Sequence, residues 1–553
     1  MNNLRVRSGA SAGSHSSSNR RAFFGRAAAV AAGLAGWTSL RSETGLTAPV
    51  SANETAAGHI RQMTAWQIRT EAAKLERNRP QADHPANGDE ARYPNKIASY
   101  SKGLPHNSLG EVDLPAFESL VHALDTGDPL DFDRILTSGG AKLVNPQAGL
   151  AFAMQGSDSH AMSMRPAPAF NSAEQAADAG EDYWMALARD IPFSDYSGNA
   201  LIQRAAADLS RFSDFRAPRQ LGRVTPTTLF RGVSLEELNG PLISQFLLQD
   251  TPFGAEAISR RMRTTIPSLD YMTTYADWLS IQNGAPAPSA VFDSTPRYIR
   301  NGRDLAEWVH IDVLFQAYFE ALLILFRLGA RRDAGNPYTA SRNQVGFATL
   351  GDPYIASILC GVAKDALKAV WFQKWFVHRR MRPEVFGGRI HNHRNGAARY
   401  PIHSDILNSE SLTEVFGRTG SYLLPQAFPE GSPLHPSYGA GHATVAGACV
   451  TILKAFFGES FVIPDHVEAA ADGTSLIPYT GTALTVGGEL NKLASNVALG
   501  RNFGGIHWRS DATESLKLGE ELAIRYLTEE RACCNERFDG YTLTKFDGTT
   551  VTI

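Results

Sequence analysis

The chain has 553 residues, of which 43% are hydrophobic and 20% are charged, so it is long enough to bury a large core and is not a small binding module. Its 53 Lys and Arg residues nearly balance its 56 Asp and Glu residues. This balance argues against nucleic acid and against an anionic membrane surface as partners, and favours a small-molecule partner. The four cysteines show no CxxC spacing, which argues against a zinc ribbon or a thioredoxin-like site.

Residues 1–55 differ in composition from the rest of the chain. A polar stretch leads to Arg20 and Arg21, and the small-residue apolar run AAAVAAGLAG follows. This order resembles a twin-arginine signal, which exports folded proteins across the bacterial inner membrane. The apolar run is too short for a membrane span. We therefore expect residues 1–55 to be an export signal with a disordered segment and the protein to be periplasmic or secreted; a disordered basic tail is the alternative.

The remaining chain is predicted to be mostly helical, and it shows no repeat of fixed period. The Pro- and Gly-rich stretch 283–296 is the most plausible divider, because the most strongly helical part of the chain follows it. It separates an N-terminal part of helices and loops, residues 56–296, from a C-terminal helical bundle, residues 297–553.

The first helix of the bundle is predicted to start at Asp304 as its N-cap and to run to Gly329. Polar residues such as Asp312 interrupt its apolar surface and exclude a transmembrane helix. The second helix, 354–380, is stopped by Pro383.

Three more helices and a hairpin complete the predicted bundle. The helices are expected at 441–458, at 488–499 and after Ser510, and the tail 541–553 alternates around Asp547-Gly548 as a β-hairpin does. The predicted fold is therefore mostly α, a helical bundle with minor β-hairpins.

Two segments of this bundle carry groups that bind anions. In KWFVHRRMRP, Lys374 and Arg382 stand about two helical turns apart, near the C-terminal end of one helix, so that two cations can converge on one anion. In HPSYGAGHATVAGAC, a Gly-rich turn opens a helix at Gly441-His442 and exposes backbone N–H groups.

The third segment, GRNFGGIHWRSD, contains Arg501, His507 and Asp511. Because His507 and Asp511 are four residues apart, the carboxylate can accept the Nδ1–H and leave Nε2 as a ligand. Taken singly, the three segments have plainer explanations: a solvated helix end, helix initiation and a structural histidine. Together they supply two arginines, a lysine, backbone amides, one ligand histidine and His442 as an acid/base, which is a full set of groups for a tetrahedral oxyanion.

The three segments resemble the signature shared by vanadium haloperoxidases and type 2 phosphatidic acid phosphatases. That signature has a Lys and an Arg-Pro pair, a Pro-Ser-x-Gly-His-like turn and an Arg-x5-His-x3-Asp segment. Lys374 and Arg382 are eight apart, and His435 stands seven before His442. Both details resemble the algal and cyanobacterial bromoperoxidases; the phosphatase pattern has a spacing of seven, and the fungal chloroperoxidases have Phe at the position of His435. NGDEARY, KGLPHNSLGEVD and NPYTASRNQVGFATLG extend the resemblance over most of the chain.

The resemblance implies that vanadate is the cofactor and that His507, with Asp511 behind it, is the axial ligand of vanadium. It implies that the vanadate oxygens are bound by Lys374, Arg382, Arg501 and the Gly441 amide. One position departs from the family pattern. The serine beside the Gly-His pair is Ala440 here, so one hydroxyl donor to vanadate is missing.

The resemblance also implies that His442 takes a proton from hydrogen peroxide, that Lys374 makes one peroxide oxygen more electrophilic, and that His435 lies beside the halide channel. The implied function is oxidation of bromide or iodide to a hypohalous acid equivalent that halogenates small organic acceptors, and we expect a homo-oligomer. Two alternatives stay open. The same residues can form an acid phosphatase in which His507 attacks phosphorus, or a non-enzymatic anion-binding protein. The spacing of Lys374 and Arg382, together with His435, disfavours the phosphatase.

Overall fold

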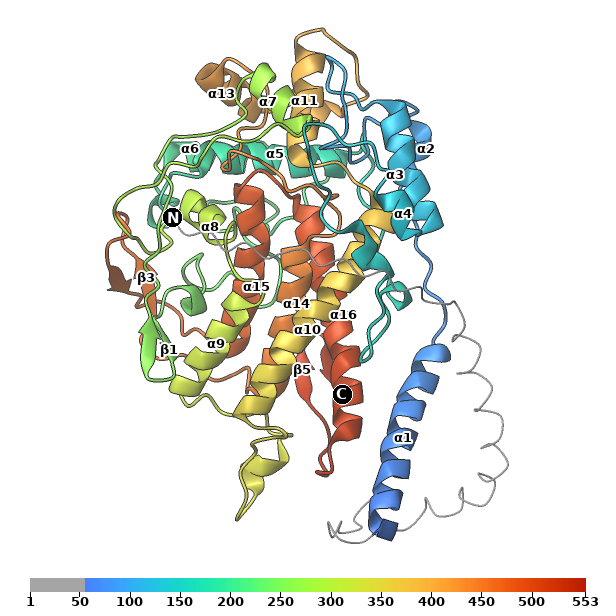
Figure 1. Ribbon diagram of the computed structural model, residues 1–553. Coiled ribbons are helices and arrows are strands. Elements are labelled where there is room, and N and C mark those ends of the chain that lie inside the picture. Colours follow the sequence, from blue (N-terminus) through green and yellow to red (C-terminus); the bar gives the residue numbers. More distant parts are fainter. Residues whose placement is uncertain (1–54) are drawn as a thin grey trace, which may run out of the picture. The chain divides into compact units, whose positions relative to one another are not determined.

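Five long helices form the central bundle, shown in Figure 1. They are α9 (Gln316–Arg327), α10 (Asp352–Phe372), α14 (Gly441–Phe456), α15 (Val486–Phe503) and α16 (Arg509–Cys533). The middle helix is α14, which contacts each of the other four. Every residue of α14 except His442 is buried. Solvent therefore reaches this helix only at its second residue.

Figure 1 shows a computed structural model, and the structure describes residues 55–553. The twin-arginine-like segment lies outside the described residues. The chain divides into two compact units, 1–70 and 71–553, and helix α1 (Thr55–Arg77) spans the boundary between them. The stretch 283–296 lies inside the second unit, and the proposed division there stays a prediction.

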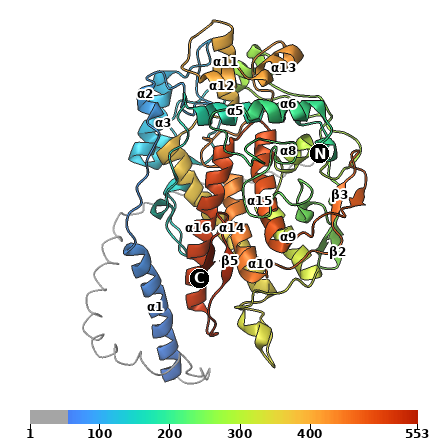
Figure 2. The same ribbon diagram turned by 180° about the vertical axis from the view of Figure 1, so that it is seen from behind.

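The other elements of the second unit surround the bundle. Helix α5 (Ala173–Ala188) crosses the ends of α15 and α16, and both views show it there (Figures 1 and 2). The other α-helices are α2 (Asp89–Arg92), α3 (Leu114–Thr126), α4 (Pro129–Phe132), α6 (Ala200–Leu209), α7 (Tyr275–Gln282), α8 (Gly302–Trp308), α11 (Pro383–Arg394), α12 (Ser404–Leu407) and α13 (Glu410–Thr419). A π-helix, η8 (Gln373–His378), extends α10. Short 3₁₀ turns are η3 (Pro146–Leu150), η4 (Ser159–Ala161), η5 (Phe193–Asp195), η6 (Gln245–Leu247) and η7 (Pro337–Ala340).

Strands are few and short. They form three antiparallel pairs: β1 (Thr251–Phe253) with β2 (Glu256–Ile258), β3 (Val467–Ala469) with β4 (Leu476–Pro478), and β5 (Thr542–Thr544) with β6 (Thr550–Thr552). The last pair is the predicted hairpin at the tail. The predicted mostly α fold with minor β-hairpins is thus confirmed. In residues 55–553, no helix has the length and apolar character needed to cross a membrane.

Two glycines allow α14 and α16 to pack closely. A Cβ at Gly447 would lie 2.1 Å from the Leu516 carbonyl oxygen, and one at Gly519 would lie 2.0 Å from the Thr444 carbonyl oxygen. Neither position can therefore carry a side chain without moving a helix. This close packing fixes the start of α14 relative to the start of α16.

The predicted helix from Asp304 to Gly329 is wrong in one respect, because it is two helices. Asn301 caps α8 by accepting a hydrogen bond from the Asp304 N–H (2.9 Å), and the helix ends at Trp308. Residues 309–315 are not helical before α9 begins. Arg501 donates a hydrogen bond to the Val309 carbonyl at the end of α8. This tertiary contact satisfies a carbonyl that would otherwise lack its helical donor.

The sequence analysis placed Lys374 and Arg382 near the end of one helix, and this prediction is wrong. The helix ends at His378, Arg379 takes a left-handed conformation (φ 37°), and Pro383 opens α11. Proline is favourable at the first position of a helix, because the N–H it lacks has no helical acceptor there. The reversal of the chain, rather than a shared helix face, brings the two cations together.

Candidate active site

The three predicted segments converge on His507. Burial lowers the pKa of the His507 ring well below its ordinary value. The positive charges of Arg382, Lys374 and Arg501, and the nearby His442, lower that pKa further. Electrostatic effects of this kind require close approach. The structure therefore gathers these predicted site residues around one imidazole.

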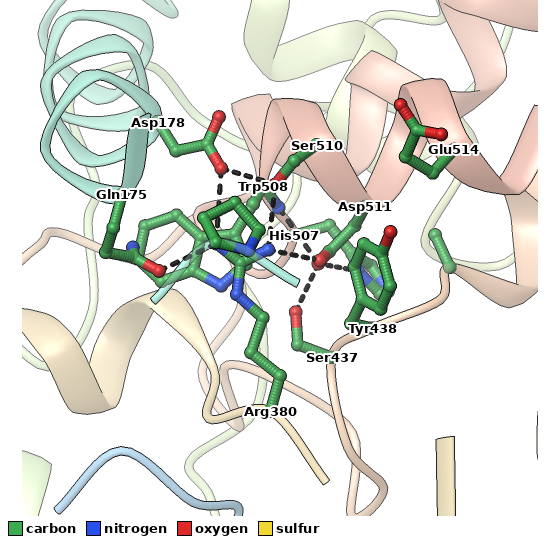
Figure 3. Close-up of polar contacts among 12 residues, drawn as sticks. Gln175, Asp178, Arg380, Ser437, Tyr438, His507, Trp508, Ser510, Asp511 and Glu514 are labelled. Atoms are coloured by element: carbon green, nitrogen blue, oxygen red, sulfur yellow. Dashed lines mark hydrogen bonds and ion pairs between the residues drawn. The ribbon is translucent and has the colours of Figure 1, made fainter. Parts of the chain in front are cut away.

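Hydrogen bonds fix the orientation and the tautomer of the His507 ring (Figure 3). Asp511 Oδ2 accepts the bond from Nδ1 (2.8 Å), and Arg382 Nη1 lies 3.0 Å from Nε2. Because a guanidinium only donates, Nε2 accepts and carries a lone pair. His507 is therefore neutral, with its unprotonated nitrogen directed toward the cations, as a ligand histidine requires.

Arg382 connects His507 to His435. Its Nε donates to the His435 carbonyl (2.9 Å), and its Nη2 donates to His435 Nδ1 (2.8 Å). Burial, and then the charges of Lys374 and Arg382, lower the pKa of His435 well below its ordinary value. The His435 ring lies 5.0 Å from the Trp371 ring. His435 is thus a neutral, polar ring beside the cations.

Lys374 and Arg501 complete the cationic group. Lys374 is fully buried, and its Nζ donates to two carbonyls, of Pro436 (2.8 Å) and Ser437 (3.1 Å). Arg501 has an Nε that is buried and finds no hydrogen-bond partner in the part of the chain that the structure describes.

The electrostatics of this group fit an oxyanion. Burial lowers the pKa of Lys374 well below its ordinary value, and lowers those of Arg382 and Arg501 to about 10. Like charges that are buried together repel one another, and a bound anion removes the repulsion. The buried Arg501 Nε, which finds no partner among the described residues, and the three neighbouring cations are the features that a tetrahedral oxyanion would satisfy.

The N-terminus of α14 adds backbone donors. Ala440 is its N-cap residue, and no side chain caps the helix there. The first amides of a helix, here beginning with Gly441, have no intrahelical acceptor and attract negative charge. A Cβ at Gly441 would lie 3.2 Å from the Trp371 ring, so the absence of a side chain lets the start of α14 lie close to Trp371.

The loop before α14 is tied to the other two segments. Ser437 donates through its Oγ to Asp511 and through its N–H to the Arg380 carbonyl (3.0 Å). The Ala440 N–H donates to Ser515 Oγ (2.7 Å) in α16. Each segment therefore restrains the others, through both backbone and side-chain hydrogen bonds.

Asp312 is a site residue whose role the sequence did not predict. Its Oδ1 lies 2.9 Å from His442 Nε2, and only 4% of its side chain is exposed. A carboxylate accepts, so Nε2 donates and Nδ1 is the nitrogen left for proton exchange. The signal in the sequence was a polar residue inside an apolar run, but nothing local linked it to His442.

Lys102 is a second residue that the sequence did not place in the site. It belongs to the segment KGLPHNSLGEVD, and its buried Nζ donates to Glu384 Oε1 (2.7 Å) and to the carbonyls of Glu430 (2.6 Å) and Ser432 (2.7 Å). It thereby holds the chain that leads into His435. A buried ion pair of this kind contributes to the position of the loop.

These groups define an oxyanion site inside a helical bundle, and known proteins resemble the chain in sequence and fold. The family model described as the VCPO second helical-bundle domain matches residues 356–536. The vanadium-dependent bromoperoxidase of Corallina pilulifera is 36% identical over 89% of this chain and 98% of its own length. That of Ascophyllum nodosum is 37% identical over 78% of this chain and 82% of its own length.

A solved structure agrees with these relatives. The homohexameric second vanadate-dependent bromoperoxidase of Ascophyllum nodosum superposes with a TM-score of 0.87 at 33% identity, over 92% of this chain and 93% of that chain. The chain therefore belongs to the vanadium-dependent bromoperoxidase family.

Proposed function

We propose that this chain is a vanadate-dependent haloperoxidase that uses hydrogen peroxide to oxidise bromide or iodide. The observation that carries the proposal is the neutral His507 ring, whose Nε2 accepts from the buried Arg382 and which lies among the charges of the buried Lys374 and Arg501. The family relationship supports the same function. The phosphatase and the non-enzymatic alternatives are not favoured, since the relatives that cover the chain are bromoperoxidases.

Each residue of the site has a task in this reaction. His507 Nε2 would bind vanadium, and the vanadate oxygens would be held by Lys374, Arg382, Arg501 and the Gly441 amide. Bound vanadate supplies Lewis acidity that polarises the O–O bond of hydrogen peroxide. His442, oriented by Asp312, accepts a proton from hydrogen peroxide and returns one to the departing oxygen. The product is a hypohalous acid equivalent, which halogenates electron-rich organic acceptors.

Reconstitution tests the proposal. Protein stripped of cofactor at low pH with a chelator should not brominate a phenolic dye, and activity should return with added vanadate. Excess phosphate should block the return, because both anions are tetrahedral and use the same donors. Full peroxidase activity in vanadium-free protein would contradict the proposal, and cleavage of a chromogenic phosphate ester by the stripped protein would support the phosphatase.

Ala440→Ser should bind vanadate more tightly than the wild type. A hydrogen bond to a charged group contributes about 1.5–3 kcal/mol, which corresponds to about a ten- to hundredfold lower dissociation constant. Equilibrium dialysis of the stripped protein measures it. Serine is also a better N-cap than alanine, so the melting temperature of the stripped protein separates helix capping from vanadate binding. An unchanged dissociation constant would show that the hydroxyl does not reach the anion.

Halide choice should follow from His435. The ring is polar and close to the cations, at the position where the chloride-oxidising relatives have an apolar ring, so we expect a more hydrated halide site. Iodide and bromide should be oxidised readily and chloride scarcely, since chloride is the hardest of the three to oxidise. Steady-state rates with each halide measure this, and His435→Phe should raise the chloride rate relative to bromide. Equal chloride and bromide rates in the wild type would overturn the assignment as a bromoperoxidase, but not the assignment as a haloperoxidase.

The assembly we propose is a homo-oligomer, because a relative with the same fold is a homohexamer. We also propose export, on the order of the residues in the first part of the chain. Replacing Arg20 and Arg21 by Lys should retain the precursor in the cytoplasm, because twin-arginine transport depends on that pair. Fractionation and N-terminal sequencing of the exported protein measure this, and a mature protein that begins at Met1 would contradict it.

A further inference from the structure

Arg380 lies directly behind the carboxylate that orients His507 (Figure 3). Its Nη1 donates to Asp511 Oδ1 (2.8 Å) and to Ser510 Oγ (2.8 Å). Only 3% of Arg380 is exposed. The other Asp511 oxygen, Oδ2, accepts bonds from His507, the Trp508 N–H and Ser437. Arg380 therefore binds Oδ1 of Asp511, the carboxylate oxygen that His507 does not contact.

The second half of the Arg380 guanidinium is bound by helix α5. Its Nη2 donates to Gln175 Oε1 (2.7 Å) and to Asp178 Oδ2 (3.2 Å). Ser510 Oγ donates to the same Asp178 oxygen, which closes a ring of hydrogen bonds. Figure 3 shows Gln175 and Asp178 reaching down from α5 toward Arg380. All of these side chains are buried, so the network is shielded from water.

The charges of the network favour a strong hydrogen bond to His507. One guanidinium is shared by two carboxylates, those of Asp178 and Asp511. Because the positive charge of Arg380 is divided between two carboxylates, it does not fully neutralise Asp511. Asp511 therefore keeps negative charge that attracts the His507 Nδ1–H. A carboxylate in this position raises the electron density at the opposite nitrogen and fixes the plane of the ring.

We propose that Arg380 and Asp178 are positioning residues for the cofactor: through Asp511 they hold His507 with Nε2 directed at the oxyanion and so set the affinity for vanadate. Neither residue touches the oxyanion position. The inference rests on the proposed function, and it extends that function to a helix, α5, that carries none of the groups predicted to bind vanadate.

The test measures vanadate binding to the stripped protein by equilibrium dialysis, together with the melting temperature. Arg380→Gln should raise the dissociation constant about ten- to a hundredfold, the effect usual for such partners of a metal ligand. Arg380→Lys should have a smaller effect, because it keeps the charge but loses the two-pronged geometry. Asp178→Asn should also weaken binding. The KM for halide and the kcat at saturating vanadate should change little, since neither residue touches substrate.

Arg509→Lys is the matched control. Arg509 is buried, lies at the start of α16 and is paired with Glu181 of α5, but it does not contact Asp511. It should lower the melting temperature while leaving the dissociation constant within about twofold of the wild type, because lysine keeps the positive charge that acts on Asp178.

Three results would overturn the inference. One is an unchanged affinity for vanadate in folded Arg380→Lys and Asp178→Asn. These two variants also provide the test if Arg380→Gln does not fold. The second is equal loss of affinity in Arg509→Lys, which would assign the effect to general stability. The third is a wild type that binds no vanadate, which would reject the proposed function and the inference with it.

Discussion

His507→Ala is expected to abolish vanadate binding and halide oxidation together. The structure gives His507 an unprotonated Nε2 that accepts a hydrogen bond from Arg382, and the charges of Lys374 and Arg501 also act on this ring. The other groups predicted to bind vanadate are cations or an amide, which cannot form a bond to a metal centre in its place. Equilibrium dialysis measures the binding, and bromination of a phenolic dye measures the activity. We expect both signals at background, even with millimolar vanadate.

A second histidine provides the control for this experiment. His391 on α11 is half-buried, accepts a hydrogen bond from the Tyr422 N–H (3.2 Å) and stacks on Tyr275. His391→Ala should cost stability while leaving vanadate binding intact. If His507→Ala retained stoichiometric vanadate, another residue would have to be the ligand, and the site as described would be wrong.

His442→Ala should separate catalysis from cofactor binding. Loss of a general acid/base lowers turnover by about 10²–10⁴-fold, whereas vanadate would still have its ligand and its cations. We expect the dissociation constant for vanadate to stay within a few-fold of the wild type, since electrostatic changes at a partly exposed site are small. Steady-state kinetics at saturating vanadate, with hydrogen peroxide varied, measure the turnover.

Asp312→Asn tests the orientation of that histidine. The amide cannot accept with the strength of a carboxylate, so the His442 ring loses its fixed tautomer, and turnover should fall less than in His442→Ala. Asp304→Asn, a buried aspartate of α8 paired with Arg300, serves as the control. Equal loss of vanadate binding and turnover in His442→Ala would assign His442 to the cofactor rather than to proton transfer.

Local spacing is what made part of the site predictable. His507 and Asp511 are four residues apart, and the structure joins them across the start of α16, with His507 just before its N-cap and Asp511 in its first turn. The start of α14 at Gly441 followed from a glycine-rich turn before an apolar helix, and the structure confirms it. When charged residues or histidines lie close together in the sequence, their spacing predicts which of them can form hydrogen bonds, even before the fold is known.

Tertiary contacts made the remainder inaccessible from sequence. Asp312 meets His442, and Arg380 meets Asp178, only because the fold brings together segments that are distant along the chain. The same limit explains the error over residues 304–329. Apolar periodicity continues through the break, and the contact from Arg501 that accommodates the break lies far along the chain.

The crowding of positive charge around His507 has a consequence for the whole fold. Lys374, Arg382 and Arg501 are locked in place by carbonyls and by the packing of α14 on α16, so they cannot move apart when no anion is present. The empty site is therefore electrostatically strained, and part of the binding energy of any tetrahedral anion appears as resistance to unfolding. Anion binding and thermal stability are then linked, and phosphate bound by the same donors should also raise the melting temperature of the stripped protein.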